Sequence, residues 1–309
     1  MITHHASKGL VWLDVSNPDT EEISGLVKRY SLHPLVGEEL MESSSLAKID
    51  FYKEYILVVL TLPVRVRAKK GDGYEIEDRE VDFVIGKNFL ITSRFDTIEQ
   101  LEYFGKVFET NSILNKEEKI EHAGHLFYYI VKRIYAGMCE DLENIKDALV
   151  SAETRVFGGD ERRMVEGLSD LSRELIDFKQ TARVHEEIWS DMISRDESSI
   201  FGKEFSIYMR DIRDDFNRIR ELISNSRELL ADLRETNDSL LNTKQNDIMK
   251  RLTLVAFIFQ PATFIAALFT IPAINVPLIE YGVGWYAILF FMLAVSAAIW
   301  YMFRRKKWM

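Results

Sequence analysis

Residues 252–309 read LTLVAFIFQPATFIAALFTIPAINVPLIEYGVGWYAILFFMLAVSAAIWYMFRRKKWM, and this stretch decides the fold. Before the basic cluster at its end, the only charged residue is Glu280, which separates two uncharged runs, 252–279 and 281–303. A helix needs about 20 consecutive apolar residues to cross a bilayer, so each run is long enough. The pattern predicts an integral membrane protein with a C-terminal two-helix hairpin.

Basic residues on both sides of the hairpin predict its orientation. Before the first run and after the second stand Lys244, Lys250, Arg251, Arg304, Arg305, Lys306 and Lys307. The positive-inside bias therefore places both ends in the cytoplasm and the short loop with Glu280 outside. We expect a multi-pass protein of the cell (inner) membrane whose N- and C-termini are cytoplasmic.

About 245 residues precede the hairpin, enough for one large or two small domains. The formal net charge is −10, and it resides in this soluble part because the flanks of the hairpin are basic. An acidic body argues against nucleic acid as a partner and suits a protein that meets cations. The single cysteine, Cys139, excludes an internal disulfide.

The chain reads as an α+β membrane protein. Runs rich in Val, Ile, Leu and aromatics predict strands at residues 10–15, 51–62, 81–85 and 89–93. Long charged helices are expected at 116–155 and 161–195, broken at Gly158-Gly159. We expect four parts: a cytoplasmic α/β domain (1–113), its long-helix part (114–200), a stalk helix (201–250), and the transmembrane hairpin with a basic tail (251–309, spans near 252–272 and 284–303).

A heptad seam marks the stalk helix. Apolar residues alternate in steps of four and three from Phe205 to Leu240, interrupted by Ser226 and Asn237. No proline occurs between Gly202 and Gln260, so this helix is expected to continue into the membrane. Two interpretations are open: a helical hairpin packed on itself, or a stalk that joins an oligomer to its membrane part. Continuity with the membrane helix favours the stalk.

The first membrane run carries its polar residues on one face, since Thr253, Gln260, Thr263 and Thr270 follow helical spacing, and the same face extended backwards takes in Met249 and Asn246. An amide that faces lipid would lack hydrogen-bond partners, at a cost of several kcal/mol. This face must therefore meet protein or water. Close helix packing with Gln260 as an interhelical hydrogen-bonding group is one interpretation. The other is a pore wall, which requires several subunits because two helices cannot enclose a water-filled path.

Several strings, in this order, resemble the CorA family of divalent-cation channels. WLDVSNPD (12–19), LHPL (32–35), IDFYKEYILVVL (49–60) and GKNFLIT (86–92) look like its cytoplasmic domain. NDIMKRLTLVAFIFQPATFIAAL (246–268) and RRKKWM (304–309) resemble its pore helix and basic tail. The resemblance implies a homopentamer with a central pore lined by the stalk helices, and a cytoplasmic funnel that senses metal. It favours the pore wall for the polar face.

The chain departs from that family at the outer end of the pore helix. The family signature Gly-Met-Asn, which forms a ring for the hydrated cation, is absent. In its place the chain has residues 270–275, Thr-Ile-Pro-Ala-Ile-Asn. Asn275 is a candidate for a shifted ring, and a turn residue between two prolines is its alternative. Glu280, repeated around an oligomer, would attract cations to the outer mouth.

The residues expected along the path carry neutral oxygens or apolar side chains. Asn246, Gln260, Thr263, Thr270 and Asn275 offer amide and hydroxyl oxygens, which suit hydrated Mg²⁺ held weakly enough to leave again. Zn²⁺ prefers imidazole and thiolate, and neither occurs in the hairpin. By resemblance, Met249 and Leu252 form an apolar gate that closes by dewetting, with ordinary packing as the alternative.

Regulation by cytoplasmic metal is expected at Asp211. The string YMRDIRDD (208–215) resembles the stalk segment that supplies an intersubunit metal ligand, and Asp211 is the matching position. A bound cation would relieve the repulsion between carboxylates across the interface. The partner acid is expected near Asp96, which together with Glu99 also reads as a capping box for the following helix.

No arrangement of a nucleophile and a base is discernible, so we do not expect an enzyme. The sequence predicts a homo-oligomeric divalent-cation channel, with Mg²⁺ as the transported and regulatory ion. Two alternatives stay open. One is a transporter of Zn²⁺ or another transition metal on the same scaffold, and the other is a non-conducting membrane receptor or scaffold.

Overall fold

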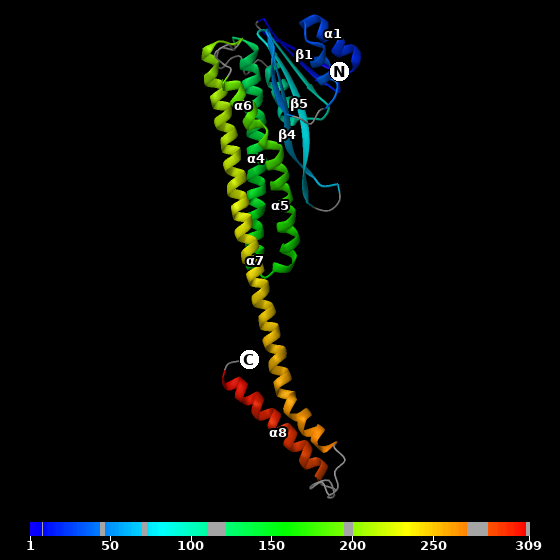
Figure 1. Ribbon diagram of the computed structural model, residues 1–309, viewed down its shortest axis with the longest axis vertical. Helices are drawn as coiled ribbons and strands as arrows, with labels where there is room; N and C mark the ends of the chain where they lie inside the picture. Colours follow the sequence, from blue (N-terminus) through cyan, green and yellow to red (C-terminus); the bar gives the residue numbers. More distant parts are fainter. Residues whose placement is uncertain are drawn as a thin grey trace. The chain divides into compact units, whose positions relative to one another are not determined.

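The computed structural model describes residues 1–7, 9–43, 47–69, 73–109, 121–194, 200–270 and 284–306. The chain divides into two units, Met1–Arg234 and Glu235–Met309. The first unit contains a six-stranded sheet and most of the helices, and the second contains two long apolar helices (Figure 1).

The sheet is mixed and has the strand order β1-β2-β6-β5-β4-β3. β2 and β6 pair in parallel, and the other neighbouring strands pair antiparallel. The strands are β1 (Ile2–Ser7), β2 (Leu10–Ser16), β3 (Lys48–Phe51), β4 (Tyr55–Arg67), β5 (Tyr74–Gly86) and β6 (Phe89–Arg94). The parallel pair brings two segments that are distant in the sequence side by side within the sheet.

Two strand predictions differ from the structure. The single strand expected at 51–62 is divided into β3 and β4, because the amide of Tyr52 donates to the carbonyl oxygen of Tyr55 at 3.0 Å and closes a turn between them. β1 was not predicted, since ITHHAS lacks the apolar and β-branched run that marks a strand. It is an edge strand whose backbone bonds to β2 hold it in the sheet.

One face of the sheet is covered by α1 (Thr20–Tyr30) and α2 (Pro34–Glu39). α1 begins after Asp19, whose carboxylate accepts a hydrogen bond from the Glu22 amide at 2.8 Å. The core beneath these helices consists of buried aliphatic side chains: Leu13, Val15, Ile23, Leu26, Leu32, Val36, Leu40, Leu57, Val59, Val84 and Ile91. Full burial of such a side chain contributes roughly 1.5–3 kcal/mol, so this layer is a major source of stability.

The opposite face is covered by α4 (Ala123–Phe157), where Phe83 of β5 meets Phe127 edge to face at 5.1 Å between ring centroids. α5 (Glu161–Arg183) packs along the β4–β5 hairpin, and α6 (His185–Ser194) is the next helix in the chain (Figure 1). The expected break at Gly158-Gly159 is confirmed, but the single helix expected at 161–195 is divided at Val184 into α5 and α6. α3 (Glu99–Glu109) contacts α4, and a 3₁₀ turn, η2 (Lys203–Phe205), precedes the last long helix of this unit.

That helix, α7 (Ser206–Phe269), carries the heptad seam and continues into the second unit without interruption, as expected. Every seam residue from Phe205 to Leu233 is buried within the single chain. Phe216, for example, packs on Tyr135 of α4 and His185 of α6, with ring centroids 6.0 and 5.8 Å apart. Up to Leu233 the seam therefore packs on its own chain, while α7 as a whole is the long stalk helix that was expected.

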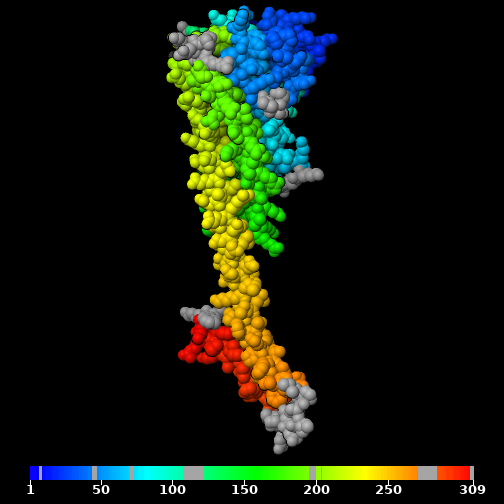
Figure 2. Space-filling view, in the orientation of Figure 1, coloured from blue at the N-terminus to red at the C-terminus, as the bar shows by residue number. Residues whose placement is uncertain are grey.

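The second unit consists of the C-terminal part of α7 and α8 (Gly284–Arg305). Both helices are long and apolar enough to cross a membrane, and Pro261 lies inside α7 without ending it. They run side by side (Figures 1 and 2), with Leu254 of α7 and Phe303 of α8 buried. The expected fold class is confirmed: an N-terminal α/β domain, a long helical stalk and two apolar C-terminal helices.

Candidate ion path and regulatory site

The polar stripe of α7 faces away from the side of the helix that is shielded in the second unit. On the shielded side, Leu254 is buried, and Ile258 and Ile265 are partly buried one and three turns further on. At about 100° per residue, Gln260 and Thr263 lie on the opposite side of the helix. Both are exposed in the single chain. The stripe is therefore open to whatever surrounds α7.

The other candidate path residues share this side of the helix. The exposed candidates in the described part of α7 and at its end fall within about one third of the helix circumference: Asn246, Met249, Leu252, Gln260, Thr263 and Thr270. Met249 and Leu252, the predicted gate, are 56% and 60% exposed. These apolar side chains can be buried from water only by contact with a partner outside the single chain.

The threonines of the stripe donate their hydroxyl hydrogens to backbone carbonyl oxygens of α7. Thr253 donates to the carbonyl oxygen of Met249 at 2.8 Å, and Thr263 donates to that of Phe259 at 3.1 Å. Thr270, at the end of α7, donates to the carbonyl oxygen of Ala267 at 2.7 Å. Since each donor is used within the helix, the hydroxyl oxygens present acceptors to the surroundings.

Three predicted site residues, Asn275, Glu280 and Lys307, lie outside the residues that the structure describes. The rest of the basic tail lies at the end of α8. Arg304 and Arg305 close this helix, and the Lys306 amide donates to the Met302 carbonyl oxygen at 3.1 Å. The guanidinium of Arg304 lies 5.3 Å from the ring centroid of Trp300, a cation–π contact.

Asp211, the predicted regulatory acid, is held by two side chains of α4. Its Oδ2 accepts hydrogen bonds from the Tyr128 hydroxyl at 2.6 Å and from Nζ of Lys132 at 2.5 Å. Nζ of Lys132 also lies 3.2 Å from Oδ2 of Asp215, one turn further along α7. This cluster joins α4 to α7, and it is partly open to solvent, with Asp211 47% exposed.

The cluster shifts the pKa values of its members in the directions that favour the ion pair. The hydrogen bonds from Lys132 and Tyr128 lower the pKa of Asp211. Burial opposes the charge on Lys132, but its contacts with Asp211 and Asp215 raise the pKa of this amine above its ordinary value. Burial and the hydrogen bond to Asp211 raise the pKa of Tyr128 to about 12. Around neutral pH the lysine is therefore charged and Asp211 is ionised.

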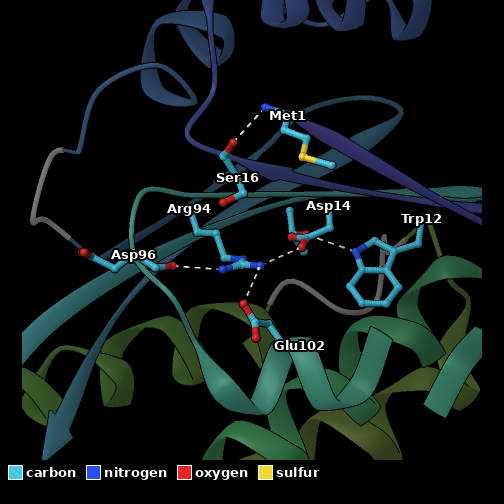
Figure 3. A network of polar contacts seen from close by, with 8 residues as sticks. Met1, Trp12, Asp14, Ser16, Arg94, Asp96 and Glu102 are labelled. Atoms are coloured by element: carbon cyan, nitrogen blue, oxygen red, sulfur yellow. Dashed lines mark hydrogen bonds and ion pairs between the residues drawn. The ribbon is translucent and has the colours of Figure 1, made fainter. Parts of the chain in front are cut away.

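Asp96, the other predicted regulatory acid, belongs to a different network (Figure 3). Its carbonyl oxygen accepts from Nη1 of Arg94 at 3.1 Å, while its carboxylate points away from the guanidinium. Arg94 also pairs with Asp14 at 3.1 Å and with Glu102 at 3.7 Å. The first backbone bonds of α3 go to the carbonyl of Ile98, so the capping box starting at Asp96 is wrong.

Within the described part of one chain, Asp96 and Asp211 have different partners. In that same part of the chain, no group of three or more His, Cys, Asp or Glu side chains is arranged to hold a metal ion. A regulatory ion at Asp211 would thus need water or a second chain to complete its ligands.

Sequence reasoning missed Lys132, Tyr128 and Asp215 as neighbours of Asp211. Tyr128 and Lys132 stand four residues apart on α4, and Asp211 and Asp215 have the same spacing on α7, so each pair shares a helix face. This spacing was a signal. The register between the two helices was not available from the sequence.

Comparison with known proteins gives a consistent result. A family model described as "CorA-like Mg2+ transporter protein" matches residues 7–305. The cobalt/magnesium transport protein CorA of Thermotoga maritima is 24% identical over 306 residues, which cover 96% of this chain and 83% of the relative.

Two solved structures have a similar fold. The complete structure of the CorA magnesium transporter from Methanocaldococcus jannaschii has a TM-score of 0.82 at 21% identity, covering 100% of this chain and 98% of that chain. The ZntB cytoplasmic domain from Vibrio parahaemolyticus has a TM-score of 0.63 at 12% identity, covering 78% and 98%.

Proposed function

We propose, starting from the fact that the chain belongs to the family of CorA-like Mg²⁺ transporters, that it forms a homo-oligomeric channel for Mg²⁺ uptake. It is a metal-ion transporter with two transmembrane helices, and not an enzyme. We place it in the cell (inner) membrane with both termini cytoplasmic, and we expect five subunits from the resemblance to this family.

The observation that carries the proposal is the exposed polar stripe of α7. The side of α7 opposite Leu254 carries Gln260 and Thr263, and nothing in the described part of the second unit buries them. In a bilayer this side must meet water or another chain, because an amide in hydrocarbon costs several kcal/mol. Several copies of α7 around an axis supply both at once: neighbouring chains and an enclosed aqueous path.

The chemistry of the stripe suits a hydrated cation. Water molecules bound to Mg²⁺ direct their hydrogens outward, so they need acceptors in the second shell. Thr253 and Thr263 present acceptors, because their own hydrogens are used within α7. Neutral oxygens hold such an ion without trapping it, as conduction requires. This favours Mg²⁺ over Zn²⁺, whose preferred imidazole and thiolate ligands do not occur in residues 252–303.

We assign the gate to Met249 and Leu252, and its control to metal at Asp211. Rings of exposed apolar side chains on the stripe side would exclude water when the copies of α7 approach each other. Asp96, from a neighbouring chain, stays the proposed partner acid of Asp211. Asn275 stays the candidate for the outer ring, and Glu280 for cation attraction at the outer mouth.

The test is ion flux into proteoliposomes, measured side by side for Mg²⁺, Co²⁺, Ni²⁺ and Zn²⁺. We expect Mg²⁺ flux in the wild type and a loss of at least about tenfold in Gln260→Leu, with the oligomer intact. Phe290→Leu on α8, where this ring is 74% exposed, is the control and should conduct normally. Flux of Zn²⁺ without Mg²⁺ supports the transition-metal alternative, and flux of none of the four supports the non-conducting receptor or scaffold.

A further inference from the structure

The two carboxylates of the Asp211 cluster already hold a cation. Nζ of Lys132 lies 2.5 Å from Oδ2 of Asp211 and 3.2 Å from Oδ2 of Asp215, and the Tyr128 hydroxyl donates to the same Asp211 oxygen at 2.6 Å. One positive charge therefore faces two negative charges, and two donors occupy the Asp211 oxygen that they share.

The fold of the single chain holds this ammonium in place. Tyr208 of α7 packs edge to face against His125 and Tyr128 of α4, with ring centroids 4.7 and 4.9 Å apart. These rings, on the N-terminal side of Asp211, fix α4 against α7. Nζ of Lys132 also lies 5.5 Å from the Tyr128 ring centroid, a second contact for the charge. The ammonium is thus a built-in part of the cluster.

We propose that Lys132 is a tethered competitor for divalent cations at Asp211 and Asp215. The proposal rests on the proposed function, in which metal at Asp211 closes the pore. A divalent ion must either displace the ammonium or bind in contact with its positive charge. Each alternative costs free energy and so raises the free Mg²⁺ concentration needed to occupy the site. Because the lysine is on the same chain, its local concentration is constant and bulk Mg²⁺ alone sets the exchange.

The vacated site offers ligands that suit Mg²⁺. Two carboxylates and the Tyr128 oxygen supply oxygen ligands, and water completes the coordination, since Mg²⁺ usually keeps several waters in proteins. When the ion replaces the ammonium, the Lys132 contact between α4 and α7 is lost. The exchange therefore links metal occupancy to the packing of α7, which continues into the membrane unit.

The test uses full-length protein in detergent. The protein is first titrated with Tb³⁺, whose emission is sensitised by a nearby tyrosine such as Tyr128, and Mg²⁺ is then added as a competitor. The signal lost in Asp211→Asn defines the site. Lys132→Met should lower the Mg²⁺ dissociation constant, obtained from the half-displacement concentration and the Tb³⁺ affinity measured for each variant, about tenfold. Lys132→Arg, which retains the charge, should stay within about twofold of the wild type.

A matched control is Arg220→Met, which removes another interhelical ion pair of α7, with Nη1 2.6 Å from Oε1 of Glu186. It should leave the Mg²⁺ dissociation constant unchanged. The proposal is overturned if Lys132→Met equals the wild type, if Arg220→Met shifts equally, or if no variant shows an Asp211-dependent signal. Should Lys132→Met fail to fold, Lys132→Gln is held to the same expectation.

Mg²⁺ flux through the same preparations separates this inference from the proposed function. If the protein conducts no ion but shows the expected order of Mg²⁺ displacement, Lys132 is supported as a competitor and the channel is contradicted. If it conducts Mg²⁺ but displacement is equal in wild type and Lys132→Met, the channel is supported and the competitor is contradicted.

Discussion

Nε2 of His185 lies 2.8 Å from the carbonyl oxygen of Thr61, 124 residues earlier in the chain. Nδ1 of the same ring lies 2.9 Å from the Tyr135 hydroxyl, which accepts from Nε1 of Trp189 at 2.6 Å. The consistent assignment has Tyr135 donating to Nδ1 and the Nε2 hydrogen donated to Thr61. Burial lowers the pKa of His185 to about 4, so the ring is neutral and ties α4 and α6 to β4.

Replacing this ring should destabilise the first unit. His185→Phe leaves the Thr61 carbonyl and the Tyr135 hydroxyl without their buried partner, at roughly 1–3 kcal/mol each, and we expect a lower Tm in detergent. The exposed His4 gives the control, since His4→Phe should leave the Tm unchanged. Wild-type Tm should also fall as pH drops from about 6.5 toward 4, because the unfolded chain takes up the proton first. Equal Tm values for His185→Phe and wild type would refute this role.

Asp82 should give the opposite pH dependence of stability. Its side chain is 1% exposed, its Oδ1 has no hydrogen-bond partner, and burial, with the nearby charges of Glu80 and Glu39, raises its pKa to about 9. The unfolded chain loses this proton near pH 4, so stability falls as pH rises from there to about 9. Asp82→Asn should raise stability at pH 7 by roughly 2–4 kcal/mol and flatten this slope. A lower Tm of the variant at pH 7 would count against a protonated Asp82.

The sequence was sufficient for features that depend on local pattern. The uncharged runs around Glu280 predicted the two apolar helices, and the seam from Phe205 predicted a long continuous helix. It was insufficient where the partner of a surface matters. The same seam fits a neighbouring subunit or its own chain, and only the packing of Phe216 on Tyr135 decides. The pairing of Lys132 with Asp211, 79 residues apart, depends likewise on the register between α4 and α7.

Asp211→Ala should weaken closure of the pore by metal. The substitution removes the carboxylate that we propose as the regulatory ligand, and it leaves Lys132 facing Asp215. We expect larger Mg²⁺ flux at high cytoplasmic Mg²⁺ with the oligomer preserved, measured in proteoliposomes loaded with graded Mg²⁺. Unchanged closure would make Asp211 only a packing residue of α4 and α7. Asp214→Ala, a neighbouring acid whose side chain is 70% exposed, is the control.

Asn275→Ala tests the outer ring. If Asn275 contacts the hydrated ion, the substitution removes one amide per subunit, each worth roughly 1 kcal/mol net. Five together would abolish selective Mg²⁺ entry without affecting assembly. Flux of Mg²⁺ against a competing monovalent ion measures this, and normal selectivity in the variant would transfer the selecting role to Thr270 and Gln260.

The most direct test of the central claim, that the stripe of α7 lines an aqueous path, is the rate at which a charged, membrane-impermeant thiol reagent modifies single cysteines in α7. Cys139 is the only cysteine, so Cys139→Ser provides the background. The account predicts rapid modification of Gln260→Cys, with block of Mg²⁺ flux, and no modification of Ile258→Cys on the shielded side. Slow and equal rates at both positions, with flux unaffected, would contradict it.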